Sequence, residues 1–245
     1  MTASRGPRRA TGSAGEATSP AGTPQGMISH NLAGQKLGRK GRGTRDRILA
    51  AAAELLASDD EAISLSAVAR RASLGMTSLY NYFTDLTELL LAVLEPVMLS
   101  AEAGFIGMLR ERWPDDELGE RCSGFVLAYY NFWSRHARLL HLRNSMADGR
   151  DRRMMVHRVT ATRPIIALVA RQMDGDPDDP ESPMMQIATV LMTGIERTVT
   201  VATDVSLTGL FGEDARRPEG HYLLPAARMM ELMIRDARQK VRGEG

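Results

Sequence analysis

The sequence predicts an all-α protein. From Thr44 onward, apolar residues recur three and four positions apart, which is the period of an amphipathic helix. No segment alternates apolar and polar residues for long enough to indicate a strand. The chain has 245 residues, 43% of them hydrophobic, so it can bury the core of one large domain or of two small ones.

The first 43 residues are predicted to be disordered, and residues 1–40 are defined as a basic N-terminal arm. They are rich in Gly, Ser, Thr and Pro and lack aromatic residues, so burial cannot offset the entropy of ordering them. Nine of the 31 basic but two of the 30 acidic residues lie in residues 1–47, which gives this segment a charge of +7 and the remainder −6. This asymmetry indicates nucleic acid or an anionic surface as partner, or a tail that only adds solubility.

The cysteine count favours a cytoplasmic protein without a metal centre or cofactor. Cys122 has no partner for a disulfide within the chain, and no Cys/His cluster has the spacing of a zinc site. The N-terminal arginines are not followed by the apolar segment of a signal peptide. The uncharged apolar stretch 182–195 is shorter than the roughly 20 residues of a membrane span, so no membrane partner is expected.

Three helices are predicted after the arm, of which the second and third are short. The first extends from Thr44, its expected N-cap, to residue 58. The second covers residues 65–72 and is capped by Ser64. After a break at residues 73–75, the third covers residues 76–83 and buries Leu79 and Phe83. Residues 64–83 therefore match a helix-turn-helix, although an ordinary helical hairpin has the same spacing.

The remaining elements are also predicted to be helices. Asp85 is expected to cap one that Pro96 should kink or interrupt, because proline removes a hydrogen-bond donor and clashes with the preceding turn. Further helices are predicted near residues 116–136, 137–146, 151–173, 184–205 and 222–241. Breaks are predicted at residues 113–115, 146–149, 174–183 and 209–220.

Four stretches in this order resemble the N-terminal domain of the TetR (tetracycline repressor) family of transcriptional regulators. They are residues 44–56 (TRDRILAAAAELL), 64–72 (SLSAVARRA), 77–83 (TSLYNYF) and 88–94 (ELLLAVL). The run Ser-Leu-Tyr-Asn-Tyr-Phe is similar to the family's Leu-Tyr-x-His/Tyr-Phe signature. The resemblance covers about residues 41–101. It implies a three-helix DNA-binding domain there and a larger helical ligand-binding and dimerisation domain over residues 102–245.

The resemblance also implies which residues contact double-stranded DNA. Thr and Asn side chains can meet base edges, tyrosine hydroxyls can donate to phosphates, and helix N-termini favour anions. Thr77 and Asn81 point away from Leu79 on the third helix, as such contacts require. The expected DNA-binding residues are Thr44, Ser64, Ser66, Met76, Thr77, Ser78, Tyr80, Asn81 and Tyr82.

Three positions depart from the family pattern. Ser73 stands where the turn usually has Gly, which predicts either a less favourable backbone at Ser73 or a different turn. Gly75 stands where Ser or Thr usually caps the third helix, and Leu86 replaces a common Lys. We hypothesise that the basic segment 36–47 compensates by following the DNA backbone or entering the minor groove.

A small hydrophobic effector is expected to bind the second domain. Residues 125–133 hold five of the twelve aromatic residues, and many Met residues lie nearby in sequence, a composition that suits an apolar ligand. Core packing explains these aromatic and Met residues equally well. For Arg143 and Arg163, which lie in apolar helical stretches, a solvated face or an internal ion pair is the alternative to a ligand contact. The candidate ligand-binding residues are Phe125, Tyr129, Trp133, Arg143, Met155 and Arg163.

The expected function is that of a homodimeric, sequence-specific regulator, a repressor released from a palindromic operator by the effector. The last two helices, near residues 184–205 and 222–241, would form the dimer interface, with small residues Ala188, Thr189 and Gly194 allowing close approach. The alternative is an all-α lipid-binding or enzymatic protein with a basic tail. No Ser/His/Asp or Cys/His set, phosphate-binding loop or apolar carboxylate pair supports an enzyme.

Overall fold

A computed structural model describes residues 38–58, 61–206 and 222–243 of the chain. Throughout these ranges the regular structure is helical, and no strand occurs, which confirms the all-α fold class. Within the same ranges, no helix is both long and apolar enough to cross a membrane. The predicted break at residues 209–220 and the predicted disorder of residues 1–37 lie outside the described residues.

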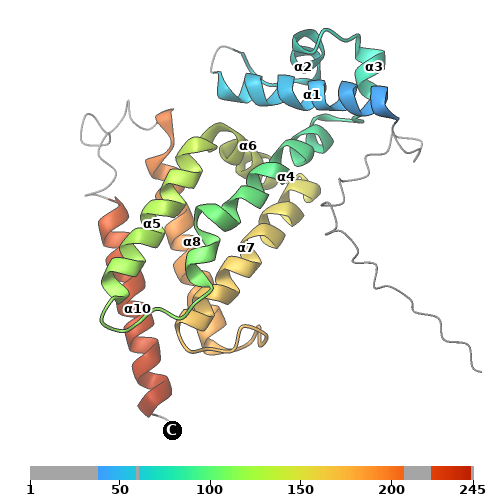
Figure 1. Ribbon diagram of the computed structural model, residues 1–245. Helices are drawn as coiled ribbons and strands as arrows, with labels where there is room; N and C mark the ends of the chain where they lie inside the picture. Colours follow the sequence, from blue (N-terminus) through green and yellow to red (C-terminus); the bar gives the residue numbers. More distant parts are fainter. Residues whose placement is uncertain (1–37, 59–60, 207–221, 244–245) are drawn as a thin grey trace, which may run out of the picture.

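Three helices gather at one end of the molecule, and α4 leads from them into a bundle of further helices (Figure 1). The first group comprises α1 (Arg39–Ala57), α2 (Leu65–Arg71) and α3 (Met76–Tyr80). The remaining elements are α4 (Leu86–Gly104), the 3₁₀ helix η1 (Ile106–Leu109), α5 (Leu118–Arg135), α6 (Ala137–Asp148), α7 (Arg152–Gln172), α8 (Pro183–Ala202) and α10 (Leu224–Gly243).

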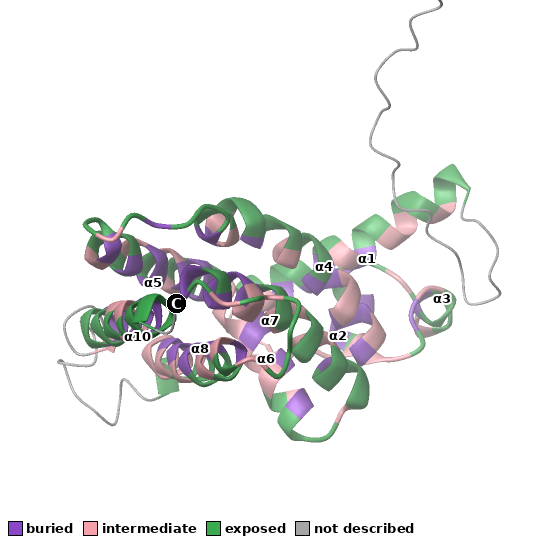
Figure 2. Ribbon diagram, turned by 90° about the horizontal axis from the view of Figure 1, so that it is seen from below, coloured by how far each residue is buried: buried purple, intermediate pink, exposed green. Residues whose placement is uncertain are grey.

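The core follows from the apolar stripes of these helices. At the small end, Ile48 and Leu55 of α1 are buried with Val68 of α2 and Leu79 of α3. Phe83 closes this core just after α3, as the sequence predicted for both Leu79 and Phe83. In the bundle, buried residues lie where α5, α7 and α8 face one another (Figure 2).

Helix α1 begins earlier than predicted, which corrects the interpretation of Thr44. Gly38 is the N-cap, and the Arg42 amide donates to its carbonyl at 3.0 Å. Thr44 lies inside the helix, where its hydroxyl donates to the Lys40 carbonyl at 3.2 Å. Residues 38–43 are therefore not disordered, because their arginine and lysine residues are good helix formers and outweigh Gly41 and Gly43.

Pro96 does not interrupt α4, so the predicted interruption is wrong, and the alternative of a kink stays a prediction. The helix continues from Leu86 to Gly104 with Pro96 inside it. Pro96 is exposed, and at such a position a helix can leave the unbonded carbonyl to water. The helix ends instead at Phe105, a buried residue that the sequence analysis did not single out.

Helices α2, α6 and α7 all end in a Schellman motif with a residue other than glycine in the left-handed region. The φ angles are 54° at Ser73, 68° at Arg150 and 59° at Asp174. After α2, the Leu74 amide donates to the Ala69 carbonyl at 2.8 Å, and the Ser73 amide to the Arg70 carbonyl at 3.1 Å. The strained backbone predicted for Ser73 is confirmed.

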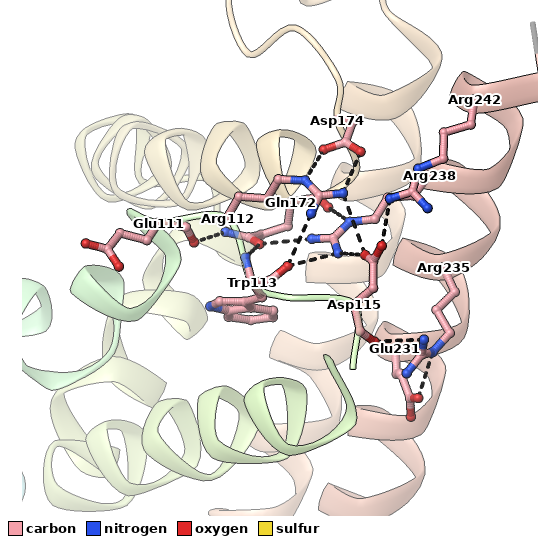
Figure 3. A network of polar contacts seen from close by, with 10 residues as sticks. All are labelled: Glu111, Arg112, Trp113, Asp115, Gln172, Asp174, Glu231, Arg235, Arg238 and Arg242. Atoms are coloured by element: carbon pink, nitrogen blue, oxygen red, sulfur yellow. Dashed lines mark hydrogen bonds and ion pairs between the residues drawn. The ribbon is translucent and has the colours of Figure 1, made fainter. Parts of the chain in front are cut away.

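A polar network joins α10 to the end of α7 and to the segment before α5 (Figure 3). Arg238 is 2% exposed and donates to the main-chain carbonyls of Gln172 at 2.7 Å and Trp113 at 3.0 Å. Arg238 and Arg242 also bind the carboxylate of Asp115. Hydrogen bonds from Arg242 and Arg238 lower the pKa of Asp115 to about 2. The network fixes where α10 lies against the bundle.

Candidate nucleic-acid interface

The pair α2–α3 is built by local interactions that the sequence largely encodes. Ser64 caps α2, its hydroxyl accepting the Ala67 amide at 3.2 Å. Gly75 precedes α3 and offers no side-chain cap, as its position predicted. Asp85 caps α4 by accepting the Glu88 amide at 2.9 Å. The short α3 is thus held between a tight turn and a capped long helix.

Helix α3 presents polar and aromatic side chains to the exterior. Leu79 is fully buried, whereas Thr77, Ser78, Tyr80 and Asn81 are exposed. The helix ends at Tyr80 rather than at residue 83, because the Tyr82 amide bonds the Leu79 carbonyl in a tighter turn. Tyr80 is 46% exposed, so a large part of this side chain is open to solvent.

The basic first half of α1 belongs to the same end of the molecule as α3 (Figure 1). The guanidinium carbon of Arg45 is 5.3 Å from the centre of the Phe83 ring, a cation–π contact that ties α1 to the residues following α3. The first nine residues of α1 carry five basic side chains and one acidic side chain: Arg39, Lys40, Arg42, Arg45, Arg47 and Asp46. The end of the molecule that carries α3 therefore has a positively charged segment at the start of α1.

The two arginines at the end of α2 contribute less positive charge than their number suggests. Arg70 pairs with Glu61, and Arg71 pairs with Glu54 at 3.4 Å. All four side chains are well exposed, so these pairs add little to stability but reduce the local positive charge. The charge next to α3 thus comes mainly from α1.

The junction after α3 is anchored to the bundle. The buried Thr87 of α4 donates to the Asp151 carboxylate at 2.6 Å, and Arg153 binds Asp85 at 2.9 Å. The hydrogen bond from Thr87 holds the pKa of the Asp151 carboxyl below its ordinary value. Sequence analysis missed these contacts because their partners lie more than sixty residues apart, beyond any local pattern.

The structure brings most of the nine predicted DNA-binding residues to one region. Ser66 is exposed on α2, where its hydroxyl lies 3.0 Å from that of Ser64. Met76 and Tyr82 are half-buried and pack against the core at the two ends of α3. Thr44 is half-buried within α1, so the premise that it sits at a helix N-terminus is wrong. Its role in binding stays a prediction.

The aromatic residues proposed for the effector site are packed against one another. Phe105 lies edge-on to the rings of Tyr129 and Phe132, with centroids 4.9 and 5.2 Å apart. The remaining cavity, which Tyr129, Trp133 and Arg143 line, has about 20 Å³. That volume holds roughly one water molecule, because a water needs about 10–15 Å³. The described conformation has no room there for an effector.

The other candidate effector residues divide between core and surface. Phe125 is buried among the rings, whereas Met155 and Arg163 are exposed on α7 and do not line this cavity. Arg143 is 4% exposed, lies 3.4 Å from Glu196 and stacks over Trp133. Burial lowers the pKa of the Arg143 guanidinium. The structure thus shows an internal ion pair for Arg143 and a solvent-exposed position for Arg163. These are the two alternatives that the sequence left open for the arginines.

Comparisons with known proteins give no assignment. No family model and no curated protein matches the chain. Among the described residues, no group of three His, Cys, Asp or Glu side chains lies together as metal ligands would.

Proposed function

We propose that this protein is a sequence-specific, double-stranded DNA-binding transcriptional regulator of the TetR type. The observation that carries the proposal is the exposed face of α3, where Thr77, Ser78, Tyr80 and Asn81 project from a helix fixed by buried Leu79. Short polar side chains can read base edges in the major groove, and a tyrosine hydroxyl can hold a phosphate. The basic start of α1 supplies the sequence-independent attraction.

The proposed regulator acts as a homodimer. A single five-residue α3 reaches only a few base pairs, whereas a two-fold dimer reads a palindrome with half-sites about one helical turn apart. Exposed apolar residues on α8 and α10, among them Val190 and Leu232, support a partner at this face. Ala188 is fully buried within the chain, so of the three small residues expected at the interface only Thr189 and Gly194 are accessible to a partner.

We further propose that it is a repressor released by a small hydrophobic effector. Release requires that the effector bind better to a conformation in which the two α3 helices no longer match the half-sites. Helix α4 joins the α1–α3 end directly to the bundle, so a shift of α4 would move α3.

Footprinting of the purified protein on the DNA upstream of its own gene, over a series of salt concentrations, tests the DNA-binding function. A short palindromic footprint is expected, with an affinity that falls as salt rises. The double variant Thr77→Ala, Tyr80→Phe should lose at least about tenfold in specific affinity, because base and phosphate contacts are removed. The matched variant Thr160→Ala, Tyr130→Phe removes the same atoms from α7 and α5 and should bind normally. Full operator affinity in the first variant would refute the assignment.

The alternative of an enzymatic or lipid-binding protein makes the opposite prediction for this experiment. A protein that uses its basic segment only for anionic surfaces would retain DNA without sequence preference, and moderate salt would abolish the retention. Competition by unrelated DNA at the same concentration distinguishes the two outcomes.

A further inference from the structure

A cleft of about 580 Å³ lies between the α1–α3 end and the bundle, and it shares no lining residue with the filled aromatic cavity. We call it the α1–α6 cleft. It is lined by Ala53, Leu56 and Ala57 of α1, Val93 and Val97 of α4, residues 134–139 and 141 around the α5–α6 turn, and residues 203–205 after α8. Its volume falls within the range of about 300–1,000 Å³ that is typical of small-molecule sites.

The lining of this cleft is apolar on one side and polar on the other. Leu56, Val93 and Val97 from α1 and α4 present only hydrocarbon. The α5–α6 turn presents two guanidinium groups, those of Arg135 and Arg138, against a single lining carboxylate, that of Asp204. The carboxylate of Asp204 already accepts the amide and the hydroxyl of Ser206, at 2.9 and 2.6 Å. The polar side therefore favours a negatively charged group.

Arg135 is the cation best placed to meet such a group. The hydrogen bond described for it runs from Nε to the Asn131 carbonyl of its own helix, at 3.2 Å, which leaves its terminal nitrogens to bind a ligand. Arg138 is engaged, because it donates to the carbonyls of Leu55 and Glu61. Burial, followed by the charge of Arg135, lowers the pKa of His136, which disfavours the charged form of this ring.

We propose that the α1–α6 cleft binds a small amphipathic monoanion, such as a medium-chain carboxylate. The hydrocarbon tail lies against Leu56, Val93 and Val97, and the carboxylate pairs with Arg135. Because α1 and the start of α6 both line the cleft, a bound ligand acts on the orientation of the α1–α3 end relative to the bundle. This regulatory consequence, unlike the binding itself, rests on the proposed DNA-binding function.

Isothermal titration calorimetry of the full-length chain with hexanoate, octanoate and decanoate tests the binding. Saturable binding at one site is expected, with an affinity that rises about tenfold for every two added methylene groups. Octan-1-ol and octylammonium, with the same tail and no negative charge, should bind more weakly than octanoate. An absence of saturable decanoate binding overturns the proposal.

Three variants locate the site. Ala57→Trp fills the cleft from an exposed position and should weaken decanoate binding at least about tenfold, whereas Ala103→Trp makes the same change on an exposed part of α4 outside the cleft. Arg135→Gln should weaken octanoate binding but not octan-1-ol binding. Circular dichroism checks that each variant folds. Decanoate binding that is unchanged in both Ala57→Trp and Arg135→Gln overturns the proposal.

DNA-binding measurements separate the site from its regulatory role. On DNA that the wild-type chain protects, decanoate should reduce protection by the wild type and by Ala103→Trp but not by Ala57→Trp. If calorimetry shows binding and protection does not change, the site stands and its role in regulation is rejected. If the chain protects no DNA, the proposed function fails, and calorimetry still decides the site.

Discussion

The guanidinium of Arg138, in the first turn of α6, donates a hydrogen bond of 2.7 Å to the main-chain carbonyl of Leu55, in the last turn of α1. The same guanidinium also donates to the carbonyl of Glu61. Carbonyls at the end of a helix have no partner within it, so Arg138 supplies one from the bundle. A single side chain thereby connects the α1–α3 end to α6.

Replacement of Arg138 by Met should loosen this connection. The loss of two charge-assisted hydrogen bonds at a half-buried position should lower the free energy of unfolding by about 1–2 kcal/mol. Hydrogen exchange should accelerate first in the last turn of α1. Arg135→Met is the matched control, because the described hydrogen bond of Arg135 stays within its own helix. Equal exchange rates in both variants would show that Arg138 does not hold α1.

Replacement of Ser73 by Gly should stabilise the protein. Ser73 has a φ of 54°, where a residue with a side chain is strained and glycine is not. The expected gain in the free energy of unfolding is about 0.5–1 kcal/mol, measured by chemical denaturation. Ser73→Ala keeps the strain and should bring no such gain. A destabilised Ser73→Gly would mean that the serine hydroxyl makes a contact that outweighs the strain.

Replacement of Arg238 by Ala should be among the most damaging changes in the bundle. Arg238 is 2% exposed, and its loss leaves the carbonyls of Gln172 and Trp113 without their donor. The expected loss is about 3 kcal/mol of unfolding free energy. Arg242 also binds Asp115 but is 60% exposed, so Arg242→Ala should cost less than about 1 kcal/mol. If Arg238→Ala and Arg242→Ala lowered the melting temperature by similar amounts, the burial of Arg238 would not be what makes it important.

Asp115 should make the free energy of unfolding depend on pH in the acid range. Hydrogen bonds from Arg242 and Arg238 hold its pKa near 2, below the ordinary value of 3.8, so the folded state favours the ionised carboxyl. Its contribution is complete above about pH 4 and is lost as the pH falls from 3.8 towards 2. Asp115→Asn should therefore show a shallower fall in melting temperature over this window than the wild type. Asp116→Asn, which changes an exposed neighbour, should keep the wild-type slope.

The sequence predicted the helices best where local signals fix them. Ser64 and Asp85 cap the helices that they were expected to cap, because an N-cap bond spans only three residues. The start of α1 was misplaced, because the many glycines of residues 1–43 indicated disorder, whereas the helix begins at Arg39. The inward positions of Leu79 and Phe83 follow from helical spacing alone.

The sequence could not predict how side chains from distant segments share space. The aromatic run of α5 suggested a ligand pocket, yet Phe105, from the segment after α4, packs against those rings. The contacts of Arg138 with Leu55 and of Arg238 with Trp113 join residues 83 and 125 positions apart. Periodicity reports which face of a helix is buried but not which helix covers it.

A single substitution that introduces a charge tests the proposed dimer face on α8 and α10. Leu232 is 49% exposed on α10, and the terminal methyl of Met229, one turn away, would lie 3.8 Å from a Cβ at Gly194 of α8. Leu232→Arg should weaken the dimer at least about thirtyfold, because an unpaired charge is placed within an apolar interface. Sedimentation velocity at micromolar concentration should then show monomers with unchanged helical content. Leu99→Arg, which changes an exposed position of α4, should remain dimeric. A dimeric Leu232→Arg would place the two-fold interface elsewhere.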